Sequence, residues 1–254
     1  MILAVDIGNT NIVIGCCENE KILFIERLST NQTATVLEYA VSIKNVLELN
    51  SIKTNQIEGA IISSVVPSVT NTVNEAIFKT IGKKSLIVGP GIKTGLSIVI
   101  DNPAQLGSDI VVDSVAGLAY YSLPLAIVDM GTATTVTVVD SKKNCTGGLI
   151  IPGVKISLDS LTGRTSQLPK ISIDAPKKVI GTNTIDSMKS GIIYGTAGSI
   201  DGVLDRIEEE LGEKITTVAT GGLAEIIIPY CRHEIILDNE LLLKGLMIIY
   251  NKNK

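Results

Sequence analysis

The stretch Leu3–Gly15, LAVDIGNTNIVIG, has a close counterpart at residues 126–139, AIVDMGTATTVTVV. Each consists of an apolar strand that ends in Asp, one apolar residue, a Gly, a few small or polar residues and a β-branched strand. Asp6 and Asp129 occupy the same position in the two stretches, and a Gly follows each of them two residues later. A repeat that includes the flanking strands indicates a chain built from two similar halves.

Turn residues and β-branched runs around both stretches predict a three-stranded meander in each half. The expected strands cover residues 1–7, 11–17 and 21–28 in the first half, with a turn at Glu18–Glu20, and residues 126–130, 135–139 and 145–151 in the second. Further short strands are expected at 60–66, 85–88 and 216–219, and apolar residues at helical spacing predict helices at 33–48, 68–81, 106–121, 156–161, 182–212 and 239–251. The sequence therefore predicts an α/β protein with two halves, residues 1–120 and 121–254, each a mixed sheet with flanking helices.

The predicted helix over residues 182–212 contains four glycines at helical spacing, Gly191, Gly195, Gly198 and Gly202. Glycine inside a helix costs about 1 kcal/mol relative to alanine. The pattern therefore predicts that this helix packs closely against another element.

Composition excludes several classes of protein. With 254 residues, 45% of them hydrophobic and 19% charged, the chain is long and apolar enough for an ordinary folded core. A net charge of −4, 3% aromatic residues and no Trp argue against nucleic-acid binding. No apolar run approaches the roughly 20 residues of a membrane helix, and no signal peptide is recognised. One His excludes multi-histidine metal sites, and four Cys without a CxxC pair indicate reduced thiols in the cytoplasm.

The repeated Asp-x-Gly turns are the best candidates for binding phosphate, because the chain has no GxxxxGK[ST] motif. A tight turn with Gly exposes consecutive backbone N–H groups that can hold an anion. Side-chain donors lie in both turns, namely Asn9, Thr10 and Asn11 in the first and Thr132 and Thr134 in the second, and the carboxylates could hold a cation against the phosphates. A third turn contains Gly221 and Gly222, where a nucleoside could approach the backbone.

Asp109 is the candidate general base. It follows Gly107-Ser108 in the first turn of the helix expected from residue 106, where the helix dipole favours its ionised form. A kinase needs such a carboxylate to orient and deprotonate the attacking hydroxyl. The local sequence by itself favours an acidic residue that only stabilises the start of a helix.

Together these motifs resemble the type III pantothenate kinase family, also described as Bvg accessory factor-like, of the acetate kinase/actin/Hsp70 superfamily. The resemblance covers essentially the whole chain. It rests on DIGNTN at 6–11, ISSVVP at 62–67, GPGIKTGL at 89–96, DNPAQLGSD at 101–109, VDMGTATT at 128–135, GGLIIPG at 147–153, IGTNT at 180–184, MKSGIIYG at 188–195 and TGGLAE at 220–225. It implies duplicated ribonuclease H-like (actin-like ATPase) domains with an ATP cleft between the halves, and ATP-dependent phosphorylation of pantothenate, the first step of coenzyme A biosynthesis. It further implies Mg²⁺, a monovalent cation (K⁺ or NH₄⁺) and a cytoplasmic homodimer.

The resemblance also implies roles for individual residues. The first phosphate loop comprises Asp6, Ile7, Gly8, Asn9, Thr10, Asn11, Ile12 and Val13. Thr132 contacts ATP in the second loop, and Asp129 binds the monovalent cation. Gly107, Ser108, Asp109 and Ile110 lie at the substrate, with Asp109 as the proton acceptor. Thr184 contacts pantothenate across the dimer interface.

The chain departs from the family's pattern in the substrate region. Ile110 stands where the family usually has Arg, Ile100 where it usually has Tyr, and Asp113 where it commonly has Asn. Arg offers five donors and a fixed charge for a carboxylate, and Ile offers neither. Two alternatives to a pantothenate kinase therefore stay open at this point: a nucleotide-binding regulatory relative, and a kinase of a less acidic alcohol.

Overall fold

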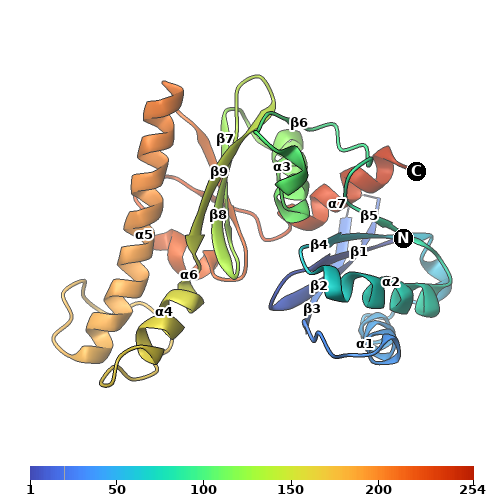
Figure 1. Ribbon diagram of the computed structural model, residues 1–254, viewed down its shortest axis with the longest axis horizontal. Coiled ribbons are helices and arrows are strands. Elements are labelled where there is room, and N and C mark those ends of the chain that lie inside the picture. Colours follow the sequence, from blue (N-terminus) through green and yellow to red (C-terminus); the bar gives the residue numbers. More distant parts are fainter. Residues whose placement is uncertain (20) are drawn as a thin grey trace. The chain divides into compact units, whose positions relative to one another are not determined.

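The computed structural model describes residues 1–19 and 21–254, so the predicted turn at Glu18–Glu20 includes one residue, Glu20, outside the described part. The chain forms two compact units (Figure 1). The first unit comprises Met1–Leu96, Asp101–Ala119 and Glu240–Lys254, and the second comprises Ser97–Ile100 and Tyr120–Asn239. The halves 1–120 and 121–254 follow the duplication along the sequence, whereas the packing brings residues 240–254 to the first unit.

The first unit is built on a five-stranded sheet in the order β3-β2-β1-β4-β5. Its strands are β1 (Ile2–Ile7), β2 (Asn11–Glu18), β3 (Lys21–Ser29), β4 (Gly59–Ser64) and β5 (Ser85–Ile87). The meander β1–β3 is antiparallel, and β4 and β5 run parallel to β1. The helices of this unit are α1 (Val36–Leu49), α2 (Pro67–Ile81), α3 (Ser108–Tyr120) and α7 (Leu241–Lys252), with short turns η1 (Thr54–Gln56) and η2 (Pro103–Gln105).

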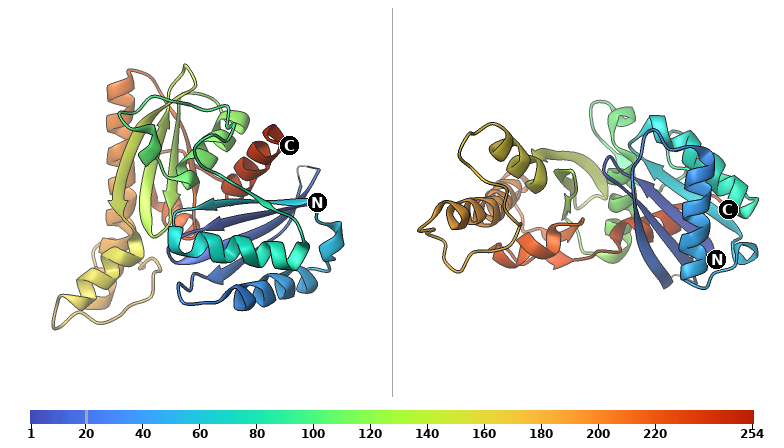
Figure 2. Two further views of the ribbon diagram at one scale, coloured as in Figure 1. Left: turned by 45° about the vertical axis from the view of Figure 1, so that its right-hand side comes forward. Right: turned by 90° about the horizontal axis from the view of Figure 1, so that it is seen from below.

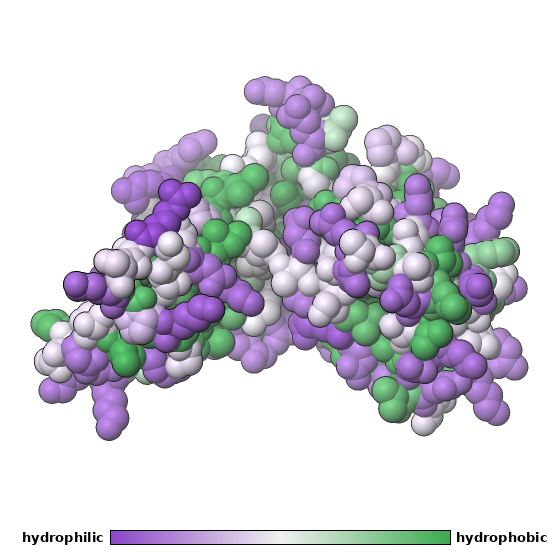
Figure 3. All heavy atoms as spheres, turned by 60° about the horizontal axis from the view of Figure 1, so that its bottom comes forward, coloured by the Kyte–Doolittle hydropathy of each residue, from purple (hydrophilic) through white to green (hydrophobic). Residues whose placement is uncertain are grey.

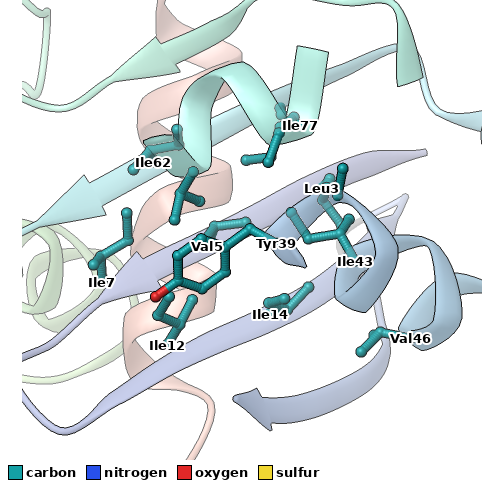
Figure 4. Close-up of a cluster of buried hydrophobic side chains, with 14 of the residues drawn as sticks. Leu3, Val5, Ile7, Ile12, Ile14, Tyr39, Ile43, Val46, Ile62 and Ile77 are labelled. Atoms are coloured by element: carbon teal, nitrogen blue, oxygen red, sulfur yellow. The ribbon is translucent and has the colours of Figure 1, made fainter. Parts of the chain in front are cut away.

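The two faces of this sheet carry different helices. The odd-numbered residues 3–7 of β1 pack in a core with α1 and α2, whereas Ile2 and Ala4 pack with α3 and α7. Figure 2 shows α1 and α2 side by side along one face of the sheet. In Figure 4, apolar side chains of β1, β2 and β4 meet those of α1 and α2, among them Tyr39. Because successive side chains of a strand point to opposite faces, Asp6 lies on the face that α3 covers.

The second unit repeats the arrangement. Its six-stranded sheet has the order β11-β10-β7-β8-β9-β6. The strands are β6 (Ser97–Ile98), β7 (Leu125–Met130), β8 (Ala133–Val139), β9 (Asn144–Pro152), β10 (Thr216–Thr220) and β11 (Ile236–Leu237). Its helices are α4 (Val154–Gly163), α5 (Thr184–Leu211) and α6 (Ala224–Ile227), followed by the turn η3 (Ile228–Tyr230).

The duplication predicted from the sequence is confirmed by this topology. In each unit an antiparallel meander is followed by two strands parallel to its first strand, and β1 and β7 have the same burial pattern along their six residues. Asp6 pairs in register with Val13 of β2, and Asp129 pairs with Thr135 of β8. The protein therefore has duplicated ribonuclease H-like domains, as predicted.

The glycines of α5 do not pack as expected. A Cβ atom added at Gly191, Gly195 or Gly198 would meet no atom within 4 Å, and one at Gly202 would meet only the Arg206 guanidinium, at 3.2 Å. The prediction that these glycines pack closely against another element of the same chain is therefore wrong. Their spacing instead gives α5 an open strip of small residues.

Figure 3 shows hydrophobic residues scattered among hydrophilic ones on the face that it presents. Within residues 1–19 and 21–254, no helix combines the length and the apolar character that a membrane span requires. All four cysteines are free, and Cys16 and Cys17 are fully buried in β2.

Candidate active site

The first Asp-x-Gly turn joins β1 to β2 and is held from two sides. The Gly8 N–H donates to the Asn11 carbonyl at 3.0 Å, which closes the turn. Thr30, directly after β3, donates its hydroxyl to the Gly8 carbonyl at 2.6 Å and its N–H to the Thr10 carbonyl at 2.9 Å. Asn9, Thr10 and Asn11 are exposed. These bonds hold the loop in shape while its polar side chains face solvent, which suits an anion-binding turn.

Asp6 lies at the end of β1, beside the end of β4. It pairs in register with Ser63, which is fully buried. Ser63 lies within 3.1 Å of the Ser108 hydroxyl at the first residue of α3, and Asp109 follows directly. The fold therefore brings the predicted first phosphate loop and the candidate base to the same end of the inner strands β1 and β4. Sequence reasoning missed this connection, although the ISSVVP motif supplied its residues.

Asp109 occupies the first turn of α3, as predicted. Its carboxylate accepts the Ile110 N–H at 2.8 Å. Burial raises the pKa of Asp109, and the backbone N–H groups of Ile110 and Asp109 lower it by less. The sequence predicted that the start of the helix would favour the ionised form of Asp109. In the structure, burial raises the pKa by more than the backbone N–H groups lower it. A carboxylate with a raised pKa is a better proton acceptor, which suits a general base.

Gly107 has a steric role beside this carboxylate. A Cβ atom at residue 107 would overlap Asp109 Oδ1 and approach Val65 to 3.8 Å. A larger residue would therefore displace the Asp109 side chain. Ile110 is half-buried on the same turn of α3, and its side chain supplies no charge there.

The second Asp-x-Gly turn joins β7 to β8, with Asp129 at the end of β7 in register with Thr220. Gly221 follows β10 with a φ angle of +95°, and a Cβ atom there would lie 2.5 Å from Asp129 Oδ1 and 2.6 Å from the Met130 nitrogen. A Cβ at Gly153 would overlap the Thr132 carbonyl. Gly153, which sequence reasoning missed, therefore lets the chain after β9 pass directly behind this loop.

These contacts bring the predicted ATP residues of the second unit together. Asp129, Gly221 and the backbone of the Thr132 turn form one cluster, and Thr132 itself is exposed. Gly222 is exposed, and an added Cβ there would meet nothing within 4 Å. A tight turn with Gly can expose consecutive backbone N–H groups, which is what an anion site requires.

The remaining substrate candidates of the second unit lie elsewhere. Ile100 follows β6, and its Cγ2 atom is 3.9 Å from where a Cβ of Gly147 would lie. Thr184 begins α5 and lines a hollow of about 790 Å³ between α4 and α5. Polar and apolar side chains mix in this α4–α5 hollow, including Ser157, Leu161, Thr182, Ser187 and Ile192.

The donor set fits a cation shared with phosphate better than a metal held by the protein alone. Within residues 1–19 and 21–254, no group of three or more His, Cys, Asp or Glu is placed to hold a metal ion. Each Asp-x-Gly turn offers one carboxylate, and Mg²⁺ typically binds through one or two carboxylates together with substrate phosphates and water.

Comparison with known proteins agrees with this geometry. The sequence profile of the family described as Type III pantothenate kinase matches residues 2–206. Proteins named Type III pantothenate kinase from Exiguobacterium sp. (strain ATCC BAA-1283 / AT1b) and Halalkalibacterium halodurans are each 42% identical, over 254 and 253 residues, and each comparison covers 100% of both chains.

Solved structures extend the comparison to the fold. A candidate Baf family transcriptional activator from Campylobacter jejuni has a TM-score of 0.60 at 19% identity, covering 99% of this chain and 98% of that one. A candidate 2-dehydro-3-deoxygalactonokinase from Sinorhizobium meliloti also has a TM-score of 0.60, at 11% identity, covering 99% and 96%. The profile match and the full-length relatives, together with the two Asp-x-Gly turns, show that the chain belongs to the type III pantothenate kinase family.

Proposed function

We propose that the protein transfers the γ-phosphoryl group of ATP to the primary hydroxyl of pantothenate. The observation that carries this proposal is the half-buried Asp109 carboxylate, which follows Ser108 at the strand ends where Asp6 begins the proposed first phosphate loop. The full-length relatives named Type III pantothenate kinase support the choice of acceptor.

Different residues would have different roles in phosphoryl transfer. Backbone N–H groups and polar side chains of the Asp6–Val13 loop and of the Thr132 turn would bind the phosphates, with Gly221 and Gly222 at the nucleoside. Asp6 would share Mg²⁺ with the phosphates, and Asp129 would bind K⁺ or NH₄⁺; these ions neutralise charge that develops on the transferring group. Asp109 would orient the pantothenate hydroxyl and accept its proton as the new P–O bond forms.

We expect ADP release that requires both pantothenate and a monovalent cation. The assay is ATP turnover by the purified chain with Mg²⁺, in K⁺ and in Na⁺, with pantothenate as acceptor and phosphopantothenate identified by mass spectrometry. Pantothenol, in which the carboxylate is replaced by an alcohol, serves as the matched acceptor. No turnover above background at millimolar pantothenate would contradict the proposal, and a preference for pantothenol would favour a kinase of less acidic alcohols.

The active form is proposed to be a homodimer in which Thr184 of the partner subunit contacts pantothenate. Large apolar side chains are exposed on α4 and in residues 179–185, two segments that also contribute residues to the α4–α5 hollow, namely Ile156, Leu161, Val179, Ile180 and Ile185. Gly191 lines the same hollow and begins the open glycine strip of α5. Exposed apolar patches beside an open backbone strip are typical of a surface that another chain covers.

Replacing Gly195 with Glu should convert this dimer to a monomer. The single chain has open space at Gly195, and Glu is a better helix former than Gly, so the fold should be at least as stable as the wild type. The bulky charge would instead be buried against the partner helix. Light scattering measures the mass, and Asn71→Glu, on the exposed side of α2, is the control that should stay dimeric. A Gly195→Glu dimer of unchanged affinity would contradict this interface.

A further inference from the structure

The two serines of the ISSVVP motif, Ser63 and Ser64, lie at the end of β4 and form hydrogen bonds that phosphate binding does not explain. The Ser108 hydroxyl lies 3.1 Å from the Ser63 hydroxyl, accepts the Ser64 N–H at 3.0 Å and donates to the Ser64 carbonyl at 2.9 Å. One side chain of α3 thus makes three contacts with the end of one strand.

The same hydroxyl network continues to α2. The Ser64 hydroxyl lies 2.7 Å from the Thr70 hydroxyl and accepts the Val66 N–H at 3.1 Å, and Thr70 donates to the Val66 carbonyl at 2.9 Å. The strand end that holds Ser108 is therefore itself fixed by the start of α2. The network therefore joins the end of β4, the start of α3 and, through Val66, the start of α2.

The position of this network relates it to the reaction. Ser63 is the register partner of Asp6, and Ser108 directly precedes Asp109. Since the Ser108 side chain points to the strand, it is not the part of residues 107–110 that reaches substrate. The backbone that carries Asp109, however, can shift only if these hydrogen bonds break.

We propose that Ser108 is a positioning residue whose hydroxyl, held by Ser63 and Ser64, fixes the Asp109 carboxylate relative to the first phosphate loop. This inference rests on the proposed function, in which Asp109 is the base. Acceptor and base must meet within hydrogen-bond reach, and a displacement of about 1 Å can cost on the order of 100-fold in rate. The three contacts of Ser108 remove that freedom before substrate binds.

The test compares Ser108→Ala with Ser114→Ala, a matched change on the same helix. Ser114 is fully buried, and within the described part of the chain its hydroxyl has no hydrogen-bond partner. We expect Ser108→Ala to lower kcat roughly 10- to 100-fold with little change in the KM for ATP, and Ser114→Ala to leave kcat unchanged. Ser108→Thr keeps the hydroxyl and should recover most of the lost rate. The stoichiometry of ATP binding, measured by calorimetry, gives the folded fraction of each variant.

A double-mutant cycle separates positioning from a general loss of structure. If Ser108 acts through Asp109, Ser108→Ala should have almost no further effect on the residual rate of Asp109→Asn. Equal losses in both backgrounds, or a Ser108→Ala rate within about twofold of wild type, would overturn the inference. An Asp109→Asn enzyme with full activity would instead refute the proposed base, which is a different failure.

Discussion

Replacing Asp109 with Asn should lower kcat by about 10²–10⁴-fold, the usual contribution of a positioned acid or base. Asn keeps the size of the side chain and can still accept the Ile110 N–H, so the local fold should survive. It cannot take a proton from the acceptor hydroxyl. Because phosphoryl transfer also depends on positioning and charge neutralisation, a residual rate above background should remain.

The pH profile provides an independent check on the same residue. Burial raises the pKa of Asp109, so the acid limb of kcat/KM should have its midpoint above the ordinary range of an aspartate. Activity is lost as the pH falls through that value, because the protonated carboxyl cannot act as a base. Glu75→Gln makes the same chemical change at an exposed carboxyl of α2 and should leave rate and profile unaltered. An Asp109→Asn enzyme with the wild-type rate would show that another group accepts the proton.

Much of the fold was predictable because the two repeated stretches match position by position, so the same strands and turns are expected in both halves. The Asp6 and Asp129 stretches predicted both meanders, and the helices came from apolar spacing along single elements. The short strands β6 and β11 were missed, since two residues carry no periodicity. Their pairing depends on distant partners, Asn144–Cys145 and Val218–Ala219.

The candidate site was predictable where a residue type carries the chemistry, and unpredictable where a residue acts through contacts. Asp109 and the Asp-x-Gly turns were identified from their residue types and spacing. Thr30 and Gly153 were not, because their roles arise from backbone atoms that lie far away in the sequence. The prediction for the glycines of α5 was wrong for a related reason. Their spacing indicates a strip of small residues on one side of the helix, but it does not tell whether the same chain covers that strip.

Gly221→Ala should strongly disturb the second Asp-x-Gly turn, which Gly221 approaches from the end of β10. At a φ angle of +95° an L side chain is strained, and its Cβ would lie 2.6 Å from the Met130 nitrogen and 2.7 Å from the Met130 carbonyl carbon. Strain of this kind costs about 1–3 kcal/mol. The Asp129 turn must move to relieve it, so we expect ATP affinity to fall about 10- to 100-fold, together with the loss of stability. Calorimetry with an ATP analogue and thermal unfolding measure the two effects.

Two other glycine substitutions serve as comparisons for Gly221→Ala. Gly222→Ala adds a Cβ in open space without a strained φ, so the stability of the protein should be unchanged. If the nucleoside approaches the backbone at this residue, the ATP affinity should fall about tenfold. Gly163→Ala at the end of α4 also adds a Cβ in open space, so the ATP affinity should stay at the wild-type value and the stability should not fall. If Gly221→Ala bound ATP as tightly as Gly163→Ala, the loop around Asp129 would not be a phosphate site. If Gly222→Ala alone kept full affinity, the nucleoside would lie away from this turn while the phosphate assignment stood.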